Sequence, residues 1–222
     1  KICKEANFPN GVINIVHGIG NKAGDALVSH PKVPIISFTG GTKTGEQIAA
    51  KAAPMFKKLS LELGGKNPNI IFEDADFNDA VKMSVKAAFS NQGQICLCGS
   101  RLFIQDSIYD NFKDAFIKET NSLIVGNPKD KKSNLGAIVS KIHMEKILQC
   151  IERAKAEGGV ILLGGKRKIL EGPLRGGYYI EPTIIENLSV KSKTNKEEIF
   201  GPVVCLIPFK TEEEVVLMAN ST

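Results

Sequence analysis

The sequence predicts an α/β fold in which most strands pair in parallel. Short apolar runs rich in β-branched residues alternate along the chain with longer segments in which apolar residues recur at helical spacing. The 222 residues are 42% hydrophobic and 24% charged, which are ordinary values for a chain that buries a hydrophobic core. There is no internal repeat and no low-complexity tract, so disorder, collagen and coiled coil are excluded.

The first third of the chain predicts three strands and two helices. The clearest strand contains Leu59, Leu61 and Leu63, which alternate with polar residues and therefore share one face, while Glu62 points to the other. In order, the predicted elements are a strand at 12–16, a helix near 21–29, a strand at 35–38, a helix at about 42–53 and the strand at 59–63.

The rest of the chain alternates in the same way, and polar residues mark where its helices begin. Their side chains can accept hydrogen bonds from the free N–H groups of a first helical turn. The predicted N-terminal caps are Asp76, Ser107, Ser140 and Thr211. The predicted strands lie at 69–72, 102–104, 160–163, 178–180 and 203–207.

Both ends of the sequence fall within predicted helices. Residues 1–6 have the pattern of a helix end, and residues 211–222 that of a helix still running at the last residue. Because a natural domain seldom begins and ends inside such elements, we expect a fragment of a longer protein.

Composition and charge exclude several partners. The 29 Lys and Arg against 24 Asp and Glu give a net charge of +5, but the cations are scattered rather than interleaved with aromatics, which argues against nucleic acid. The longest apolar runs are about five residues, far from the ~20 that span a bilayer. Five cysteines without a secretory signal favour reduced thiols in the cytoplasm, and their spacing predicts no metal site.

Two glycine-rich turns resemble phosphate-binding loops. The segment 40–45 joins a predicted strand to a helix, where free N–H groups and the helix dipole suit a phosphate. Glu46 stands where a P-loop requires Lys, which excludes a P-loop nucleotide triphosphatase. A nucleotide site and a plain strand–helix turn both remain open. The segment 18–24 lacks the spacing of a dinucleotide fingerprint and predicts a simple turn.

Two side chains are candidates for chemistry. Cys96 follows a predicted helix in a polar loop, where a thiol can be exposed and act as a nucleophile, whereas Cys205 lies in an apolar run. Glu62 can serve as a base or simply face solvent. His143, in the first turn of its helix, is expected to face solvent.

Six motifs, in order, resemble those of the aldehyde dehydrogenase superfamily. Residues 61–68 are similar to its glutamate signature and residues 89–100 to its cysteine signature, with the family's spacing of 34 positions between Glu62 and Cys96. The other motifs lie at 38–42, 135–141, 177–183 and 197–202. The similarity spans essentially all 222 residues, and the stretch 96–101 resembles the branch that acts on aminomuconate semialdehyde and retinal.

This resemblance implies a three-layer α/β/α fold with a mostly parallel sheet, truncated at both ends. Residues 1–63 would be the C-terminal part of a nicotinamide-cofactor-binding domain, and residues 64–222 a catalytic domain that is incomplete at its C-terminus. Cys96 would be the nucleophile and Glu62 the base that activates water. The implied cofactor-binding residues are Gly40, Gly41, Thr42, Gly45, Leu63, Gly64, Glu198 and Phe200. Gly41 replaces a serine common in the family, which removes a hydroxyl but keeps the amide.

The implied reaction is oxidation of an aldehyde to a carboxylic acid through a Cys96 thiohemiacetal and thioester, with the Cys96 N–H stabilising the oxyanion. NAD is the expected cofactor and NADP the alternative. We expect a cytoplasmic homodimer or homotetramer for the full-length protein, and no activity for the 222 residues alone, because the family's second oxyanion donor would precede them.

The sequence allows three alternative functions. A relative that passes the thioester to coenzyme A is opposed by Glu62, which such a route can dispense with. A non-catalytic binding protein on the same fold is opposed by the presence of both Cys96 and Glu62. A hydrolase that pairs Cys96 with His143 is the third.

Overall fold

The computed structural model describes residues 2–222, and the chain forms two compact units that meet between Leu63 and Gly64. The first unit is small. Its helices and strands are α1 (Ile2–Glu5), α2 (Asp25–Ser29), β1 (Ile35–Gly40), α3 (Thr42–Ala52) and β2 (Lys58–Leu63).

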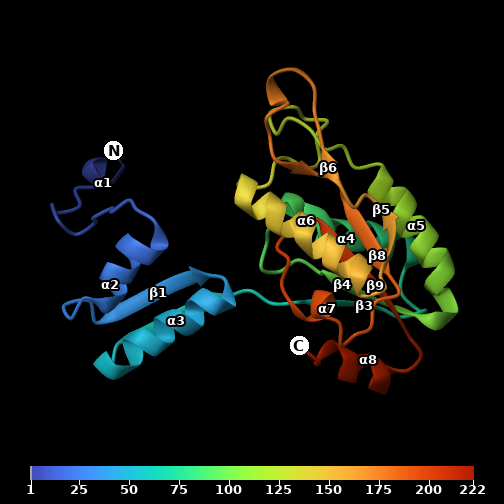
Figure 1. Cartoon of the computed structure of the whole chain (residues 1–222), viewed down its shortest axis with the longest axis horizontal. Helices are drawn as coiled ribbons and strands as arrows, with labels where there is room; N and C mark the ends of the chain where they lie inside the picture. Colours follow the sequence, from blue (N-terminus) through green and yellow to red (C-terminus); the bar gives the residue numbers. More distant parts are fainter. Residues whose placement is uncertain (1) are drawn as a thin grey trace. The chain divides into compact units, whose positions relative to one another are not determined.

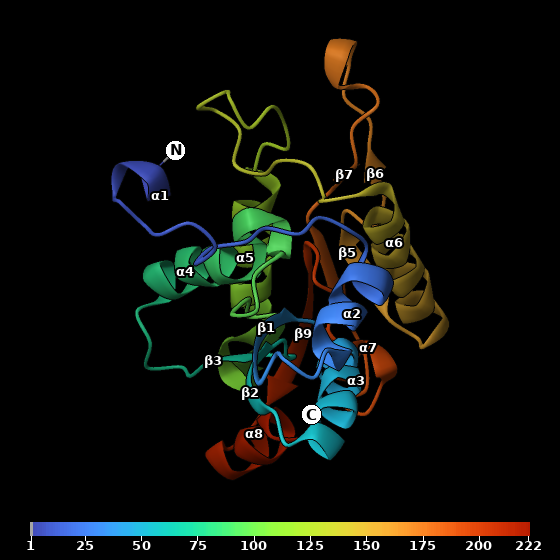
Figure 2. The ribbon, with the colours of Figure 1, turned by 90° about the vertical axis from the view of Figure 1, so that its left-hand side faces the viewer.

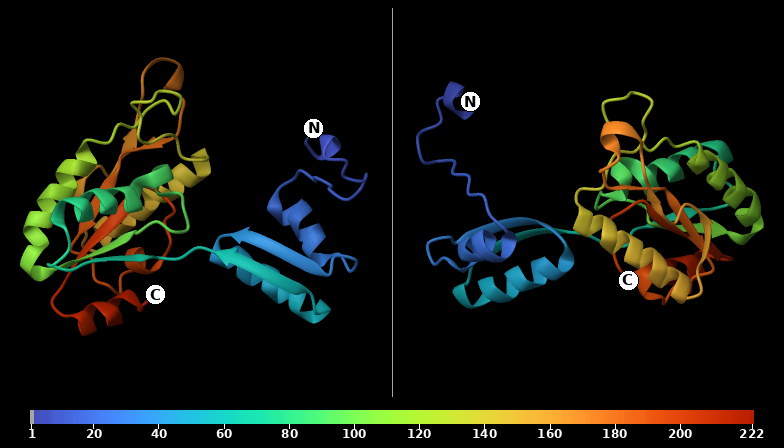
Figure 3. Two further views of the ribbon diagram at one scale, coloured as in Figure 1. Left: turned by 180° about the vertical axis from the view of Figure 1, so that it is seen from behind. Right: turned by 45° about the horizontal axis from the view of Figure 1, so that its top comes forward.

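In the first unit, β1 and β2 form a parallel two-stranded sheet with α3 lying along it (Figure 3). The register places Thr39 beside Glu62 and Gly40 beside Leu63. The buried residues of α3 recur at helical spacing, at Gly45, Ile48 and Ala52, because one stripe of the helix faces the sheet. The predicted strand at 59–63 and helix at 42–53 are confirmed.

The start of the chain contains one predicted helix and lacks one predicted strand. The strand predicted at 12–16 is wrong: these residues form a bend and irregular chain that belong to no strand, and Ile15 is 78% exposed. A strand needs a neighbour for its N–H and C=O groups, and within the described residues β1 pairs only with β2. The helix predicted at 1–6 is observed as α1, with residue 1 outside the described residues.

The second unit carries the larger sheet. Its helices and strands are β3 (Pro68–Ile71), α4 (Phe77–Phe89), β4 (Arg101–Gln105), α5 (Tyr109–Asn121), α6 (Lys141–Ala156), β5 (Val160–Leu163), β6 (Arg167–Lys168), β7 (Tyr179–Ile180), β8 (Thr183–Glu186), α7 (Lys193–Lys196), β9 (Val203–Phe209) and α8 (Glu212–Ala219).

Five strands of this unit form one sheet in the order β3-β4-β9-β8-β5, and only the pairing of β5 with β8 is antiparallel. Helices α4 and α5 cover one face and α6 covers the other (Figures 1 and 2). Alternate residues of β9 enter the two cores: Val204 and Leu206 pack with α4 and α5, and Val203 and Cys205 with α6. The predicted three-layer α/β fold with a mostly parallel sheet is confirmed.

The predicted helix caps are confirmed at three of four positions. Asp76, Ser140 and Thr211 each accept a hydrogen bond from the N–H three residues on, at 3.0, 3.2 and 3.3 Å. The cap at Ser107 is wrong, because this hydroxyl donates to Glu73 instead, at 2.6 Å. A 3₁₀ turn over Asp106–Ile108 intervenes, and α5 begins at Tyr109.

The sequence predicted that the last helix runs to the final residue, and this is wrong. Helix α8 ends at Ala219. The guanidinium of Arg101 donates to the carbonyls of Met218 and Ala219, at 3.1 and 2.7 Å. The side chain of Asn220 donates to the carbonyl of Val216 at 2.9 Å. The carbonyls of Val216 and Met218 also accept from the N–H groups of Asn220 and Ser221, so the last turn of α8 is held by both backbone and side-chain donors.

Candidate active site

Cys96 lies in a tight turn of residues 95–98, which we call the thiol turn. The N–H of Cys98 donates to the carbonyl of Ile95 at 3.1 Å and closes the turn. Cys96 itself is exposed. Within the described residues, the N–H groups of Cys96 and Leu97 donate to no acceptor. The turn therefore presents a reachable thiol and free backbone donors, the two components that thiol attack on a carbonyl requires.

Asn67 holds this turn from the side. Its amide nitrogen donates to the carbonyls of Cys96 and Cys98, at 2.6 and 3.1 Å. The carbonyl of Asn67 accepts from the N–H of Arg101 at 3.2 Å, so the strand segment that carries the amide is itself anchored. Sequence reasoning missed this residue, because Asn67 stands 29 positions before Cys96 and no spacing rule joins them.

The neighbouring thiol of Cys98 has a different environment. Cys98 is 7% exposed, and its sulfur lies 3.9 Å from the carbonyl of Ser90. Burial raises the pKa of the Cys98 thiol, because the thiolate loses its hydration. Of this close pair, Cys96 is therefore the one that reagents and substrates can reach.

Glu198 and Gly64 lie in contact in the second unit. The backbone of Gly64 passes so close to the Glu198 carboxylate that a Cβ at position 64 would overlap it. Glu198, Phe200 and Cys98 line one small pocket, together with Gly65. Three of the predicted cofactor-binding residues, Gly64, Glu198 and Phe200, are thus gathered on one side of this unit.

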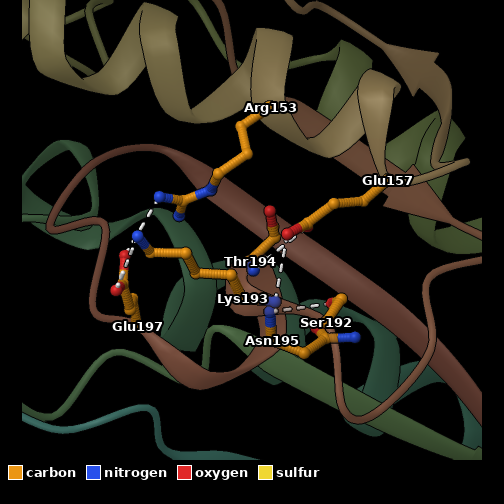
Figure 4. A network of polar contacts seen from close by, with 7 residues as sticks. All are labelled: Arg153, Glu157, Ser192, Lys193, Thr194, Asn195 and Glu197. Atoms are coloured by element: carbon orange, nitrogen blue, oxygen red, sulfur yellow. Dashed lines mark hydrogen bonds and ion pairs between the residues drawn. The ribbon is translucent and has the colours of Figure 1, made fainter.

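A polar network anchors the segment that leads to Glu198 (Figure 4). The carboxylate of Glu157, at the end of α6, accepts from the N–H groups of Lys193 and Thr194 at 3.1 and 3.2 Å and so caps α7. Burial opposes ionisation of Glu157, but hydrogen bonds from Thr194 and Lys193 outweigh it and lower the pKa of Glu157. Arg153 pairs with Glu197 at 3.0 Å. The residue before Glu198 is therefore tied to α6.

His143 was expected to face solvent, and this is wrong. The side chain is half-buried, and its Nε2 lies 2.6 Å from the carbonyl oxygen of Phe200. Because a carbonyl only accepts, Nε2 carries the hydrogen. Phe200 has a left-handed backbone with φ 58°, and its ring lies 6.0 Å from the imidazole. Local sequence could not show that the start of α6 packs against residue 200. Within the described residues no hydrogen bond joins His143 to Cys96.

The remaining predicted cofactor-binding residues lie in the first unit, where β1 meets α3. The N–H groups of Thr44 and Gly45 donate to the carbonyl of Gly41, at 3.0 and 3.1 Å, whereas those of Thr42 and Lys43 have no described acceptor. A Cβ at Gly41 would meet nothing within 4 Å, so the approach to these N–H groups is open. Free donors at the positive end of an 11-residue helix fit a pyrophosphate.

Leu63 and Glu62 point to opposite faces of β2. The Leu63 side chain packs on Gly45, where a Cβ would come within 2.7 Å of it, so glycine is required for α3 to approach the strand. Because side chains alternate along a strand, Glu62 points away from α3, and it is exposed. Gly40 pairs with Leu63, so the first unit's candidates lie together at the carboxyl ends of its two parallel strands.

No three His, Cys, Asp or Glu side chains in residues 2–222 gather where they could hold a metal ion. None of the helices in this described range is both long enough and apolar enough to cross a membrane.

The second unit thus presents an exposed cysteine on a tight turn, and the first presents a strand–helix junction with free N–H groups. The sequence profile of the aldehyde dehydrogenase family matches residues 1–222, and the chain belongs to this family.

Relatives of this family match along the whole chain. The 2-aminomuconic semialdehyde dehydrogenase of Mus musculus is 50% identical over 223 aligned residues, which cover 100% of this chain and 46% of that protein. The peroxisomal aminoaldehyde dehydrogenase 1 of Pisum sativum is 44% identical and matches 44% of its own length. The chain thus spans about half the length of the curated relatives it matches.

Solved structures agree. Betaine aldehyde dehydrogenase of Staphylococcus aureus, crystallised in complex with NAD⁺, superposes with a TM-score of 0.95 at 42% identity. The match covers 98% of this chain and 43% of that one. An aldehyde dehydrogenase of Bacillus cereus matches with a TM-score of 0.94 at 42% identity. These likenesses support the three-layer fold described above.

Proposed function

We propose that the protein containing this chain oxidises an aldehyde to a carboxylic acid with NAD, through a covalent intermediate on Cys96. The observation that carries the proposal is the thiol turn: Cys96 is exposed, the turn is pinned by Asn67, and the Cys96 N–H is free. The Cys96 thiolate attacks the aldehyde carbon, and the N–H of Cys96 stabilises the oxyanion of the resulting thiohemiacetal.

The other predicted residues take roles in binding and in the second half of the reaction. Glu62 acts as the base that removes a proton from water during thioester hydrolysis, an assignment that rests on its signature motif. In the first unit, the pyrophosphate is held by the junction of Gly40, Gly41, Thr42 and Gly45, as its free N–H groups suggest. In the second, Gly64, Glu198 and Phe200 hold the nicotinamide riboside. When bound, the cofactor supplies the hydride acceptor.

We propose that the first unit binds the cofactor and that the second carries out the reaction. Residues 1–63 supply the end of a nicotinamide-cofactor-binding domain, because they contain the open strand–helix junction. Residues 64–222 supply the thiol-bearing catalytic domain, because they contain Cys96 and the sheet that supports it. Leu63, the last residue of the first unit, packs on Gly45 of α3.

The proposed substrate is a semialdehyde of the 2-aminomuconic type. Four animal 2-aminomuconic semialdehyde dehydrogenases are 48–50% identical to this chain, whereas the betaine and amino-aldehyde dehydrogenases that match are 43–44% identical. NAD rather than NADP is proposed because several similar structures were crystallised with NAD⁺.

We further propose a reducing, cytoplasmic location and a homodimeric or homotetrameric assembly. All five cysteines are free, which suits a compartment that keeps thiols reduced. Sedimentation of the purified protein tests the assembly, and fluorescent tagging in cells tests the location.

The experiment that tests the reaction compares two variants of the whole protein. Cys96→Ser should abolish aldehyde oxidation. Glu62→Gln should give a single burst of NADH and then stall, because acylation is retained and only deacylation needs the base. Steady turnover by Glu62→Gln without a burst would contradict the role of Glu62. Formation of acyl-coenzyme A on adding coenzyme A would favour the acylating alternative.

A further inference from the structure

We infer that Asn67 is a positioning residue for the reaction at Cys96. This inference rests on the proposed function, since it concerns the same thiol. Asn67 touches neither the sulfur nor any proposed substrate group; its amide acts on the backbone of the thiol turn. Both of its hydrogens are used, one on the carbonyl of Cys96 at 2.6 Å and one on that of Cys98 at 3.1 Å.

The two hydrogen bonds determine which way the neighbouring N–H groups point. In a trans peptide the C=O of one residue and the N–H of the next point in opposite directions. With its carbonyl directed at Asn67, the Cys98–Gly99 peptide turns its N–H the other way, where it donates to the carbonyl of Ala87 at 3.1 Å. The carbonyl of the Cys96–Leu97 peptide is likewise directed at Asn67, so the Leu97 N–H points away from Asn67. This N–H has no described acceptor.

Of the peptides in the thiol turn, the one between Cys96 and Leu97 depends most on Asn67. Within the described residues, the Cys96 carbonyl accepts a hydrogen bond only from Asn67, whereas the Cys98 carbonyl also accepts from the N–H of Ser100 at 2.9 Å. Without the amide, the Cys96–Leu97 peptide could rotate and place its carbonyl oxygen where the Leu97 N–H now stands, one residue from the Cys96 N–H that stabilises the oxyanion. A carbonyl dipole in that place would repel an oxyanion that the present N–H groups favour. The amide therefore matters for attack on carbonyl compounds rather than for thiol reactivity in general.

Two reactions of the Cys96 thiol separate attack on a carbonyl from general thiol reactivity, and both can be measured on the whole protein that contains this chain. With p-nitrophenyl acetate, the thiolate forms a C–S bond to the acyl carbon, an oxyanion develops, the C–O bond breaks and p-nitrophenolate leaves with its electron pair. With iodoacetamide, the thiolate displaces iodide at a saturated carbon and no oxyanion forms. Peptide mapping by mass spectrometry identifies the modified cysteine in each case.

Asn67→Leu keeps the approximate shape of the side chain and removes both donors. We expect its rate of p-nitrophenolate release in the first turnover to fall about tenfold, while its rate of iodoacetamide alkylation at Cys96 stays within about twofold of wild type. Asn67→Gln retains an amide on a longer side chain and should recover part of the acylation rate. Asn67→Ala, which also removes both donors and adds no charge, gives the same comparison if the leucine variant fails to fold.

Asn69→Leu is the matched control. Asn69 lies two positions on, and its amide donates to the Ser84 hydroxyl at 3.1 Å and to no group of the thiol turn. Both rates should stay within about twofold of wild type in this variant. An equal loss of acylation and alkylation in Asn67→Leu, or no loss of either, would overturn the positioning role. Absence of acyl-Cys96 in the whole wild-type protein would instead overturn the proposed function as well, so the two failures are distinguishable.

Discussion

Replacement of Arg101 by methionine should destabilise the second unit strongly. Arg101 begins β4 and is 1% exposed. Its Nε donates to the carbonyl of Lys66 at 2.8 Å, and its Nη atoms donate to the carbonyls of Met218 and Ala219. One buried guanidinium thus links the segment before β3, the strand β4 and the end of α8. Methionine fills a similar volume but donates nothing.

The magnitude follows from these three hydrogen bonds. Each has a charged donor and contributes about 1.5–3 kcal/mol, so their loss removes about 4.5–9 kcal/mol of gross interaction. Burial of the cation costs several kcal/mol, and burial lowers the pKa of Arg101, so the neutral replacement recovers part of this loss. The negative end of the α8 dipole, at Met218 and Ala219, stabilises the buried cation. The desolvation cost that methionine would relieve is therefore smaller. We expect a net loss of about 3 kcal/mol.

Urea unfolding followed by circular dichroism measures this loss, and about 3 kcal/mol should lower the thermal midpoint by about 6–12 °C. Arg167→Met is the matched control, because Arg167 is exposed and donates to a single carbonyl, that of Gly177, at 3.0 Å. The control should change the free energy of unfolding by less than about 0.5 kcal/mol. If Arg101→Met were as mild as the control, the assignment of this link would be refuted.

Three further predictions follow from single contacts. Gly64→Ala should displace the Glu198 carboxylate and raise the KM for NAD of the whole enzyme more than it lowers kcat, as measured by steady-state kinetics. Glu157→Gln should cost about 1 kcal/mol at pH 7. The folded pKa of Glu157 is lowered, so its contribution to stability is present above the unfolded pKa of about 4.3. This contribution is lost as the pH falls through the folded pKa. The urea unfolding curves of wild type and variant should therefore converge in acid. Ser140→Ala, which removes the α6 cap, should cost about 1 kcal/mol in urea unfolding, and Ser140→Gly less.

Tertiary contacts explain most of the predictions that were wrong. Residues 12–16 have the composition of a strand, but no strand of the described residues lies beside them. Ser107 has the spacing of a cap, yet Glu73 takes its hydroxyl hydrogen. His143 stands on the first turn of a helix, where exposure is usual, but the carbonyl of Phe200 meets its ring. In each case a partner distant in sequence decided the outcome.

The sequence by itself determined the features that depend on near neighbours along the chain. Apolar periodicity placed the strands and helices of the second unit, because alternation with a period of two or 3.6 residues is read within one segment. Capping side chains such as Ser140 were found because the cap and its N–H lie three residues apart. The signature motifs around Glu62 and Cys96 sufficed to indicate the family, which the match along residues 1–222 bears out.

Only the tertiary structure showed what supports the candidate site. Asn67 and Cys96 are separated by 29 positions, and Arg101 and Ala219 by 118, so no local pattern links either pair. The strands β3, β4 and β9 bring them together by pairing in parallel, an arrangement that requires long connections between neighbouring strands. Hydrogen bonds act over about 3 Å regardless of separation in sequence, and the folded chain alone decides which donors and acceptors come that close.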